Sequence, residues 1–238
     1  MVYQVYLNWE GNQYNGREIL VFPNRQYADE FYNRCITTRT TTNPLDDIVR
    51  HTPQFWSFFM SAESRPYYFI DSNAKDLIPT TMVARISGYD NNHATGAMPI
   101  IHNDPTANVE YRSGGSYYIR TKSTPHLYWF LKDTNIYLDT RKATKFQIYR
   151  DDSERNRQSD DRRVLERKDL VQLSALNASG SQDVGVSNQI VTTAQSPFQF
   201  SFGCFYNGNF GVDWSSEGND PYLVYRASYA GEEWELVN

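Results

Sequence analysis

Apolar and polar residues alternate in short segments along most of this 238-residue chain. Because successive side chains of a β-strand point to opposite faces of its sheet, alternation with a period of two predicts strands with one buried face. Each segment is bounded by Gly, Asn, Asp, Ser or Pro, which are typical of turns. We therefore predict a mostly β protein, with strands in the segments YQVYLNW (3–9), REILVFP (17–23), SYYIRTK (116–122), NIYLDT (135–140), KFQIYR (145–150), LVQLSAL (170–176), QFSFGCFY (199–206), YLVYRAS (222–228) and EWELV (233–237).

Helical periodicity is confined to the first third of the chain. Asn24 is suited to cap a helix over residues 25–38, in which Tyr27, Phe31 and Cys35 fall on one face. A second segment, 44–60, is interrupted by a proline and is expected to form at most two short helical pieces.

The segment 88–115 is rich in Gly, Asn, Pro and Asp, a composition that is typical of a loop or linker. We therefore place a domain boundary near residue 112. Residues 1–111 are expected to form a smaller α+β domain, to which the sequence assigns no role. Residues 112–238 are expected to form an all-β domain.

Charge and composition exclude several classes of protein. The formal net charge is −5, which disfavours a general nucleic-acid binder because such proteins carry a basic stripe. No apolar run approaches the roughly 20 residues that a transmembrane helix needs. The N-terminus has no basic segment followed by an apolar stretch, so we expect cytoplasmic synthesis without a signal peptide, which leaves leaderless release open. Two cysteines cannot form a disulfide framework.

After residue 112 the chain can be divided into three units of four short strands each. A charged insertion, 151–168, separates the first unit from the second and is expected to be a solvated loop. Each unit closes on an aromatic residue, then Gln or Glu, then an apolar residue, which suits a strand that seals the end of a barrel. These triplets are Phe146-Gln147-Ile148, Phe198-Gln199-Phe200 and Trp234-Glu235-Leu236.

Three such units in one half of the chain resemble the β-trefoil, specifically its ricin-B-like and fascin-like group. The closing triplets stand where the lectin branch of that group has a glutamine-x-tryptophan signature, here in a degenerate form. The resemblance implies a C-terminal β-trefoil of three four-stranded repeats behind the smaller α+β domain. It also implies shallow carbohydrate pockets in the repeats, which need no cofactor and no metal.

A pocket of this kind combines an acidic side chain that accepts hydrogen bonds from sugar hydroxyls, a ring that stacks on the flat sugar face, and an Asn or Gln. In the structural alternative, the tryptophans pack in the core and the aspartates make turn hydrogen bonds to the backbone. Matched unit by unit, the carbohydrate-binding candidates are Asp213, Trp214, Asn219 and Tyr222 in the third unit, Asp183 and Asn188 in the second, and Trp129 and Asp133 in the first.

Catalytic constellations are not evident in the sequence. The four histidines show no metal-ligand spacing with one another, and neither an HExxH nor a CxxC motif is present. Cys35, on the apolar face of the predicted helix, is expected to be a core residue. We therefore expect no enzyme, no metal and no cofactor.

The expected function is that of a non-catalytic, lectin-like protein, defence-related, whose partners are glycans or glycoconjugates. One alternative is a toxin or an inclusion-type protein that self-associates and uses the trefoil for targeting or assembly. A second alternative is a protein-binding trefoil, either a protease inhibitor or a cytoskeletal binder.

Overall fold

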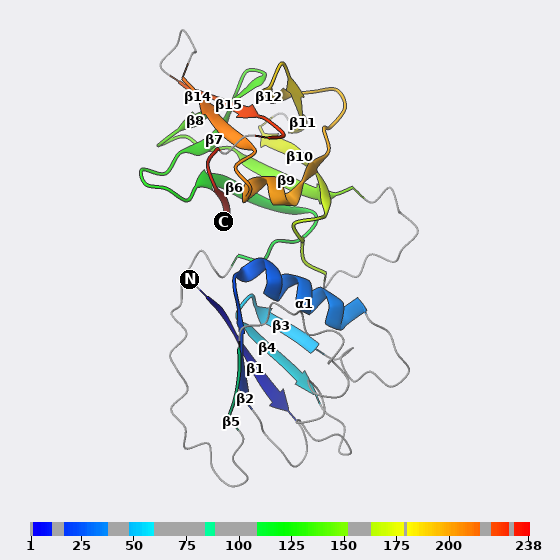
Figure 1. The fold of residues 1–238 in the computed structure, drawn as a ribbon. Coiled ribbons are helices and arrows are strands. Elements are labelled where there is room, and N and C mark those ends of the chain that lie inside the picture. Colours follow the sequence, from blue (N-terminus) through cyan, green and yellow to red (C-terminus); the bar gives the residue numbers. More distant parts are fainter. Residues whose placement is uncertain are drawn as a thin grey trace. The chain divides into compact units, whose positions relative to one another are not determined.

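The computed structural model describes residues 2–10, 17–37, 48–59, 84–88, 109–151, 163–178, 180–214, 220–228 and 231–238. The chain divides into two compact units, whose elements are labelled in Figure 1. Unit 1 comprises Met1–Glu110 and Asp160–Val164, and unit 2 comprises Tyr111–Ser159 and Leu165–Asn238. Asp160–Val164 therefore groups with unit 1, although it lies inside the predicted C-terminal range.

Unit 1 contains a five-stranded mixed sheet with the strand order β3-β4-β1-β2-β5. Its strands are β1 (Tyr3–Glu10), β2 (Arg17–Phe22), β3 (Ile48–Thr52), β4 (Phe55–Phe59) and β5 (Ala84–Gly88). β1 pairs parallel with β4, whereas the other neighbouring strands pair antiparallel. Inward side chains of β1 to β4 and of the helix form one core, which includes Val5, Leu7, Leu20, Phe22, Ile48 and Trp56.

The predicted helix is confirmed as α1 (Arg25–Thr37). The side-chain oxygen of Asn24 accepts a hydrogen bond from the backbone N–H of Tyr27 at 3.4 Å, as an N-cap residue does. Phe31 and Cys35, from the predicted apolar face, are buried in the core of unit 1. Burial raises the pKa of the Cys35 thiol far above its ordinary value, so this cysteine is an apolar core residue.

The helical pieces expected within residues 44–60 are wrong for the described part of that segment, which forms a hairpin of β3 and β4. Pro53 lies in the turn between the two strands. Proline lacks the N–H that a continuing helix needs, and the flanking β-branched and aromatic residues favour strands. The register of the pair shifts between Arg50 and Thr52, which marks a bulge.

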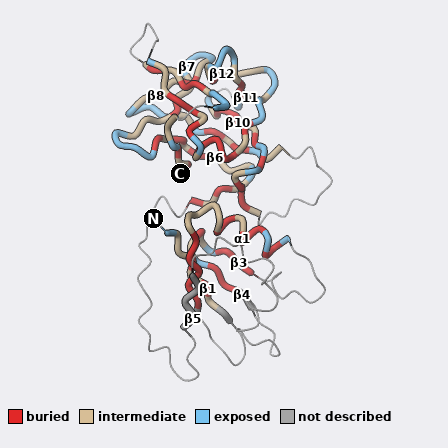
Figure 2. The backbone as a smooth tube through the Cα atoms, in the orientation of Figure 1, coloured by how far each residue is buried: buried red, intermediate tan, exposed pale blue. Residues whose placement is uncertain are grey.

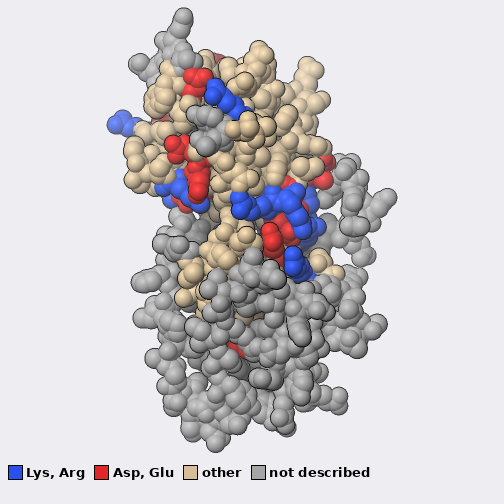
Figure 3. Space-filling model, in the orientation of Figure 1, with Lys and Arg blue, Asp and Glu red and all other residues tan. Residues whose placement is uncertain are grey.

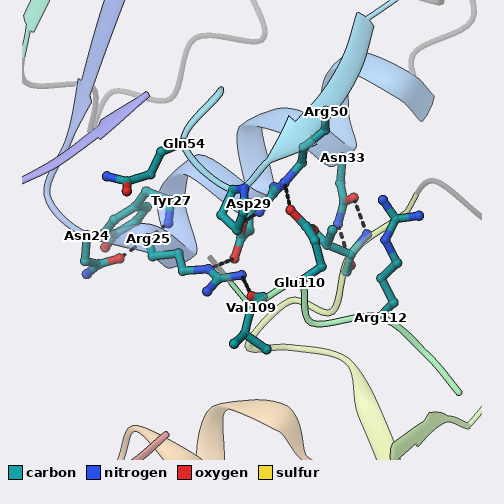
Figure 4. Close-up of polar contacts among 12 residues, drawn as sticks. Asn24, Arg25, Tyr27, Asp29, Asn33, Arg50, Gln54, Val109, Glu110 and Arg112 are labelled. Carbon is teal, nitrogen blue, oxygen red and sulfur yellow. Dashed lines mark hydrogen bonds and ion pairs between the residues drawn. The ribbon is translucent and has the colours of Figure 1, made fainter. Parts of the chain in front are cut away.

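A buried ionic network joins α1 to β3 and to Glu110 (Figure 4). The Arg50 guanidinium donates to Asp29 at 2.7 Å and to Glu110 at 2.8 Å. It also lies 5.2 Å from the ring centroid of Tyr32 and 5.6 Å from that of Trp56. Desolvation alone would lower the pKa of Arg50, but the two carboxylates outweigh it and raise that pKa, so the buried cation is retained.

Two further side chains of α1, Arg25 and Asn33, contact the segments at Val109 and Val164. Arg25 donates to the carboxylate of Asp29 at 3.3 Å and to the backbone oxygen of Val109 at 2.5 Å. Asn33 donates to the backbone oxygen of Val164 at 2.8 Å and accepts from its N–H at 3.0 Å. The helix therefore fixes both the Val109 segment and the Val164 segment through buried polar groups (Figure 4).

Unit 2 is a closed barrel of eight antiparallel strands. Around the ring the order is β6-β7-β8-β15-β12-β11-β10-β9, and β9 pairs with β6 again. Three outer strands, β13, β14 and β16, pair with β10, β15 and β6. The elements are β6 (Gly115–Thr121), β7 (Tyr128–Lys132), β8 (Asn135–Asp139), β9 (Lys145–Arg150), β10 (Leu170–Asn177), β11 (Gly180–Ser187), β12 (Ile190–Thr193), β13 (Phe200–Ser201), a 3-10 helix (Phe202–Phe205), β14 (Phe210–Asp213), β15 (Tyr222–Tyr225) and β16 (Trp234–Val237).

Aromatic rings fill the interior of the barrel around Trp129. The centroid of the Trp129 ring lies 4.8 to 5.8 Å from the centroids of Phe146, Phe205, Phe210 and Trp234. All five side chains are fully buried. Figure 2 shows the buried positions concentrated in the strands and the exposed positions in the loops that join them. Each aromatic pair of this kind adds roughly 0.5–1.5 kcal/mol beyond the area that it buries.

The expected β-trefoil is wrong. The ring has eight strands, with β13, β14 and β16 outside it, and the three units do not repeat one strand arrangement. The strand predicted over residues 199–206 is instead the two-residue strand β13 followed by the 3-10 helix Phe202–Phe205. In the second closing triplet, Phe198 lies outside any strand and is 38% exposed, while Phe200 is buried. Triplet spacing is a local property, whereas the pairing of distant strands decides the fold.

The coarser prediction of a mostly β protein is confirmed. Unit 1 adds a small mixed sheet with α1, which is the one α-helix among the described residues. Unit 2 is the barrel with its outer strands.

We predict that Trp129→Ala destabilises the protein by about 3–5 kcal/mol, because it removes four ring contacts and leaves a cavity. Trp129→Phe keeps a ring in the core and should cost clearly less. Urea unfolding followed by far-UV circular dichroism measures both variants. A Trp129→Ala protein as stable as the wild type would contradict the central position of this ring.

We predict that Arg50→Met destabilises the protein by about 3–5 kcal/mol, because the buried Asp29 and the partly buried Glu110 lose their shared cation. Arg34→Met, at an exposed position in the last turn of α1, is the control and should change stability by less than about 0.5 kcal/mol. Thermal unfolding of both variants provides the comparison. Equal melting temperatures would show that the ionic network does not hold unit 1 together.

Candidate functional site

The inward position of Trp129 decides which side chains of the neighbouring strands face outward. Trp129 of β7 is buried, so the adjacent Phe130 points away from the barrel interior. In β8, Ile136 and Leu138 are buried, and Tyr137 between them points outward for the same reason. The alternation thus places aromatic side chains on the outside of two adjacent strands.

Four outward residues on adjacent strands stand directly opposite one another. Phe130 of β7 pairs with Tyr137 of β8, and Tyr137 pairs with Tyr222 of β15. Tyr222 in turn pairs with Asp213 of β14. Directly opposed residues have their side chains on the same face of a sheet. We call these four residues, Phe130, Tyr137, Tyr222 and Asp213, the aromatic row.

The two tyrosines of the aromatic row touch each other. Their ring centroids are 4.7 Å apart, with 33° between the ring planes, and the Tyr137 hydroxyl donates to the Tyr222 hydroxyl at 3.3 Å. Both side chains, and that of Phe130, are partly exposed. Because neighbouring strands lie about 4.8 Å apart, the three rings span a surface roughly 10 Å long.

Charged side chains border the aromatic row. Lys132 Nζ lies 5.4 Å from the centroid of the Tyr137 ring and 3.1 Å from Asp220 Oδ2. Lys142 Nζ lies 5.3 Å from the centroid of the Phe130 ring. The hydrogen bond with Asp220 raises the pKa of Lys132, which stays protonated. Figure 3 shows acidic and basic side chains next to one another on the face that it presents.

Trp214 follows Asp213 directly in the chain, and its side chain is 69% exposed. Trp56, Trp129 and Trp234 are fully buried, so Trp214 differs from the other tryptophans whose side chains the structure describes. A large ring left in solvent buries little apolar area in the free protein. The ring is therefore accessible to a ligand, at the position that follows Asp213 in the chain.

These groups together can bind a ligand that has flat apolar faces and many hydroxyls. Aromatic rings cover apolar faces, whereas carboxylates accept hydrogen bonds and ammonium groups donate them. Of the predicted candidates, Asp213 and Tyr222 lie opposite each other here, because β14 and β15 pair directly, and Trp214 follows Asp213 in the chain. Asn219, predicted for the same site, lies outside the described residues.

Asp183 lies apart from the aromatic row, at an open hollow on β11 and β12. The Ser174 hydroxyl donates to Asp183 Oδ1 at 2.8 Å and fixes the carboxylate. The hollow is lined mostly by hydroxyl, amide and carboxylate side chains, from Ser181, Gln182, Asp183, Thr193, Ala194 and Gln195. No aromatic residue is among them, so this hollow lacks the rings that the aromatic row offers to a flat ligand face.

The other predicted residues have structural surroundings. Trp129 is the centre of the barrel core, so its ring is not accessible to a ligand in this structure. Asp133 and Asn188 are exposed and have positive φ angles of 56° and 49°, in the turns after β7 and β11. Aspartate and asparagine tolerate this left-handed conformation better than most residues, which accounts for both residue types.

Sequence reasoning missed Phe130, Tyr137, Lys132 and Asp220. The sequence predicts a strand around Tyr137, at 135–140, but that prediction does not say which of its faces meets the core. The signal was present in β8, where Ile136 and Leu138 flank Tyr137 with the expected alternation. Pairing of β8 with β15, which brings Tyr137 beside Tyr222, leaves no mark in the sequence.

The described residues also contain a few groups that could take part in catalysis. They hold no group of three or more His, Cys, Asp or Glu that could bind a metal ion. Cys204 is buried, with its Sγ 3.7 Å from the Tyr225 hydroxyl, and burial raises the pKa of Tyr225 to about 12. In unit 1, His51 Nε2 lies 2.7 Å from Ser57 Oγ. An imidazole that activates a hydroxyl is normally oriented by a third group, and the described part of unit 1 shows none on His51.

Neither a protein-family model nor a curated protein sequence matches this chain. Among the described residues, no helix has the length and apolar character needed to cross a membrane. The function is therefore argued from the surface of unit 2 alone.

We predict that Trp214 accounts for the tryptophan fluorescence that an aqueous quencher reaches most easily. Trp214→Phe should lower the Stern–Volmer constant for iodide and shift the emission maximum to shorter wavelength. Steady-state quenching of the wild type and the variant measures this. Identical quenching of the two proteins would contradict the exposed position of this ring.

Proposed function

We propose that unit 2 binds carbohydrate without catalysing a reaction, and that the aromatic row and Trp214 form the binding surface. The observation that supports this most is the outward row of three rings that ends at Asp213, next to an exposed tryptophan. The proposal does not depend on the trefoil resemblance, because it starts from strand register and exposure in the barrel.

The chemistry of a sugar matches what the surface offers. A pyranose presents an apolar face of C–H groups, and rings such as Tyr137 and Tyr222 can stack on it. The sugar hydroxyls need both hydrogen-bond acceptors and hydrogen-bond donors. The carboxylate oxygens of Asp213 and Asp220 can accept, and the Lys132 ammonium can donate. A shallow surface of this kind makes few contacts with each sugar unit, so we expect the affinity for a single sugar unit to be weak.

The composition of the surface favours a glycan over a protein partner. The centre of a protein–protein interface is depleted in Lys and Asp, because such charges must be desolvated there. In this surface Lys132, Asp213 and Asp220 stand among the rings. A ligand with many hydroxyls can hydrogen-bond these charges and keep them partly hydrated, which an apolar protein surface cannot do.

A glycan array probed with the full chain tests the proposal. We expect saturable binding that a free sugar competes away. Tyr137→Ala, and the double change Asp213→Ala with Trp214→Ala, should each weaken binding by about 3- to 10-fold or more, the value of one or two ring contacts. The control is Tyr149→Ala, which removes a tyrosine that is 41% exposed on β9, outside the aromatic row, and should bind like the wild type.

Two outcomes would overturn the proposal. One is a silent array at high protein concentration, and the other is binding that survives the double change. A silent array together with ordered self-assembly would support the inclusion-type alternative. A silent array together with protease inhibition or co-sedimentation with actin would support the protein-binding alternative.

A further inference from the structure

The two ends of the aromatic row differ in charge. At the end formed by β14 and β15, Asp213 and Asp220 contribute carboxylates, and Asp220 is paired with Lys132. At the opposite end, beyond Phe130, the turn after β8 carries Arg141 and Lys142. A ligand that lies along the row therefore meets acidic groups at one end and basic groups at the other.

Asp139 holds the basic turn in place. Its Oδ1 accepts the backbone N–H of Arg141 at 2.6 Å and that of Lys142 at 2.9 Å. These backbone hydrogen bonds, that of Arg141 first, lower the pKa of Asp139, so the carboxylate stays ionised as the acceptor of the turn. The side chains of Arg141 and Lys142 are exposed, and neither makes an ion pair within the described part of unit 2.

Lys142 is placed where a charge on the ligand would lie. Its ammonium is 5.3 Å from the centroid of the Phe130 ring, at the end of the aromatic row. An exposed cation–π contact is weak, so the ammonium can move to an anionic group on a sugar at little cost. The neutral sugars that follow would then lie on Tyr137 and Tyr222.

We infer that the carbohydrate is anionic, and that its carboxylate or sulfate group binds at Arg141 and Lys142 while neutral sugar residues stack on Tyr137 and Tyr222. This inference rests on the proposed function, because it names the ligand class of the same surface. It also specifies how the oligosaccharide lies along the aromatic row, with its anionic group at the Phe130 end.

Matched glycans test the inference. Wild-type protein is titrated with array glycans in sets that differ in one group, for example lactose, 3′-sialyllactose and 3′-sulfolactose. We expect the anionic members to bind about 5- to 10-fold more tightly than the neutral member at low salt. This advantage should largely disappear at 1 M NaCl, where the Debye length falls to about 3 Å. The sialylated and sulfated members distinguish a carboxylate ligand from a sulfate ligand.

Variants of Arg141 and Lys142 test whether the anionic group of the ligand binds at these two side chains. Arg141→Gln with Lys142→Gln should remove the preference for the anionic members, so that the anionic and neutral members of each set bind equally tightly. Lys168→Gln removes an exposed positive charge elsewhere in unit 2, one that is paired with Glu166, and should leave the preference intact. Equal affinity for neutral and anionic members would overturn the inference while the proposed function stands. A silent array would overturn both.

Discussion

The packing of Trp129 against four other rings is the constraint on which the outer surface of unit 2 depends. Once this indole lies inside the barrel, alternation fixes the direction of every other side chain in β7, and strand pairing carries the choice into β8 and β15. A shift of one residue would exchange the two faces and place Trp129 outside. The outward orientation of the aromatic row therefore follows from the packing of the core. Its aromatic character follows from the residue types at the outward positions of β7, β8 and β15.

Rings on the outside of a barrel require an explanation, because exposed apolar surface is an aggregation hazard. Here the hazard is reduced by charge. Lys132 and Lys142 lie near the rings of Tyr137 and Phe130, and Asp220 is paired with Lys132. The same charges that keep the surface hydrated also offer hydrogen-bond partners to a sugar. In unit 1 the charges lie inside the unit instead: Arg50 and Asp29 are buried, Glu110 is partly buried, and together they link the helix to the sheet.

Local features of the sequence predicted local features of the structure. Alternation identified most of the strands, and Asn24 with the apolar face of 25–38 identified the one α-helix among the described residues. The segment YWFLK of β7 shows why the candidate surface was predicted only in part: both faces carry large apolar residues, and only Lys132, on the same face as Phe130, indicates which face is outward. The trefoil prediction failed for a related reason, since the closing triplets carry no information about which distant strands pair. Asp213 and Tyr222, which are near in sequence, lie opposite each other because one strand pair, β14 with β15, joins them.

The central claim is that a glycan lies on Tyr137 and Tyr222. The most direct measurement is nuclear magnetic resonance of the tyrosine ring signals during titration with the strongest array glycan. The account predicts saturable shifts of the Tyr137 and Tyr222 rings, with the Tyr149 ring unchanged. Saturation that leaves Tyr137 and Tyr222 unperturbed while other rings shift would place the ligand elsewhere and contradict it.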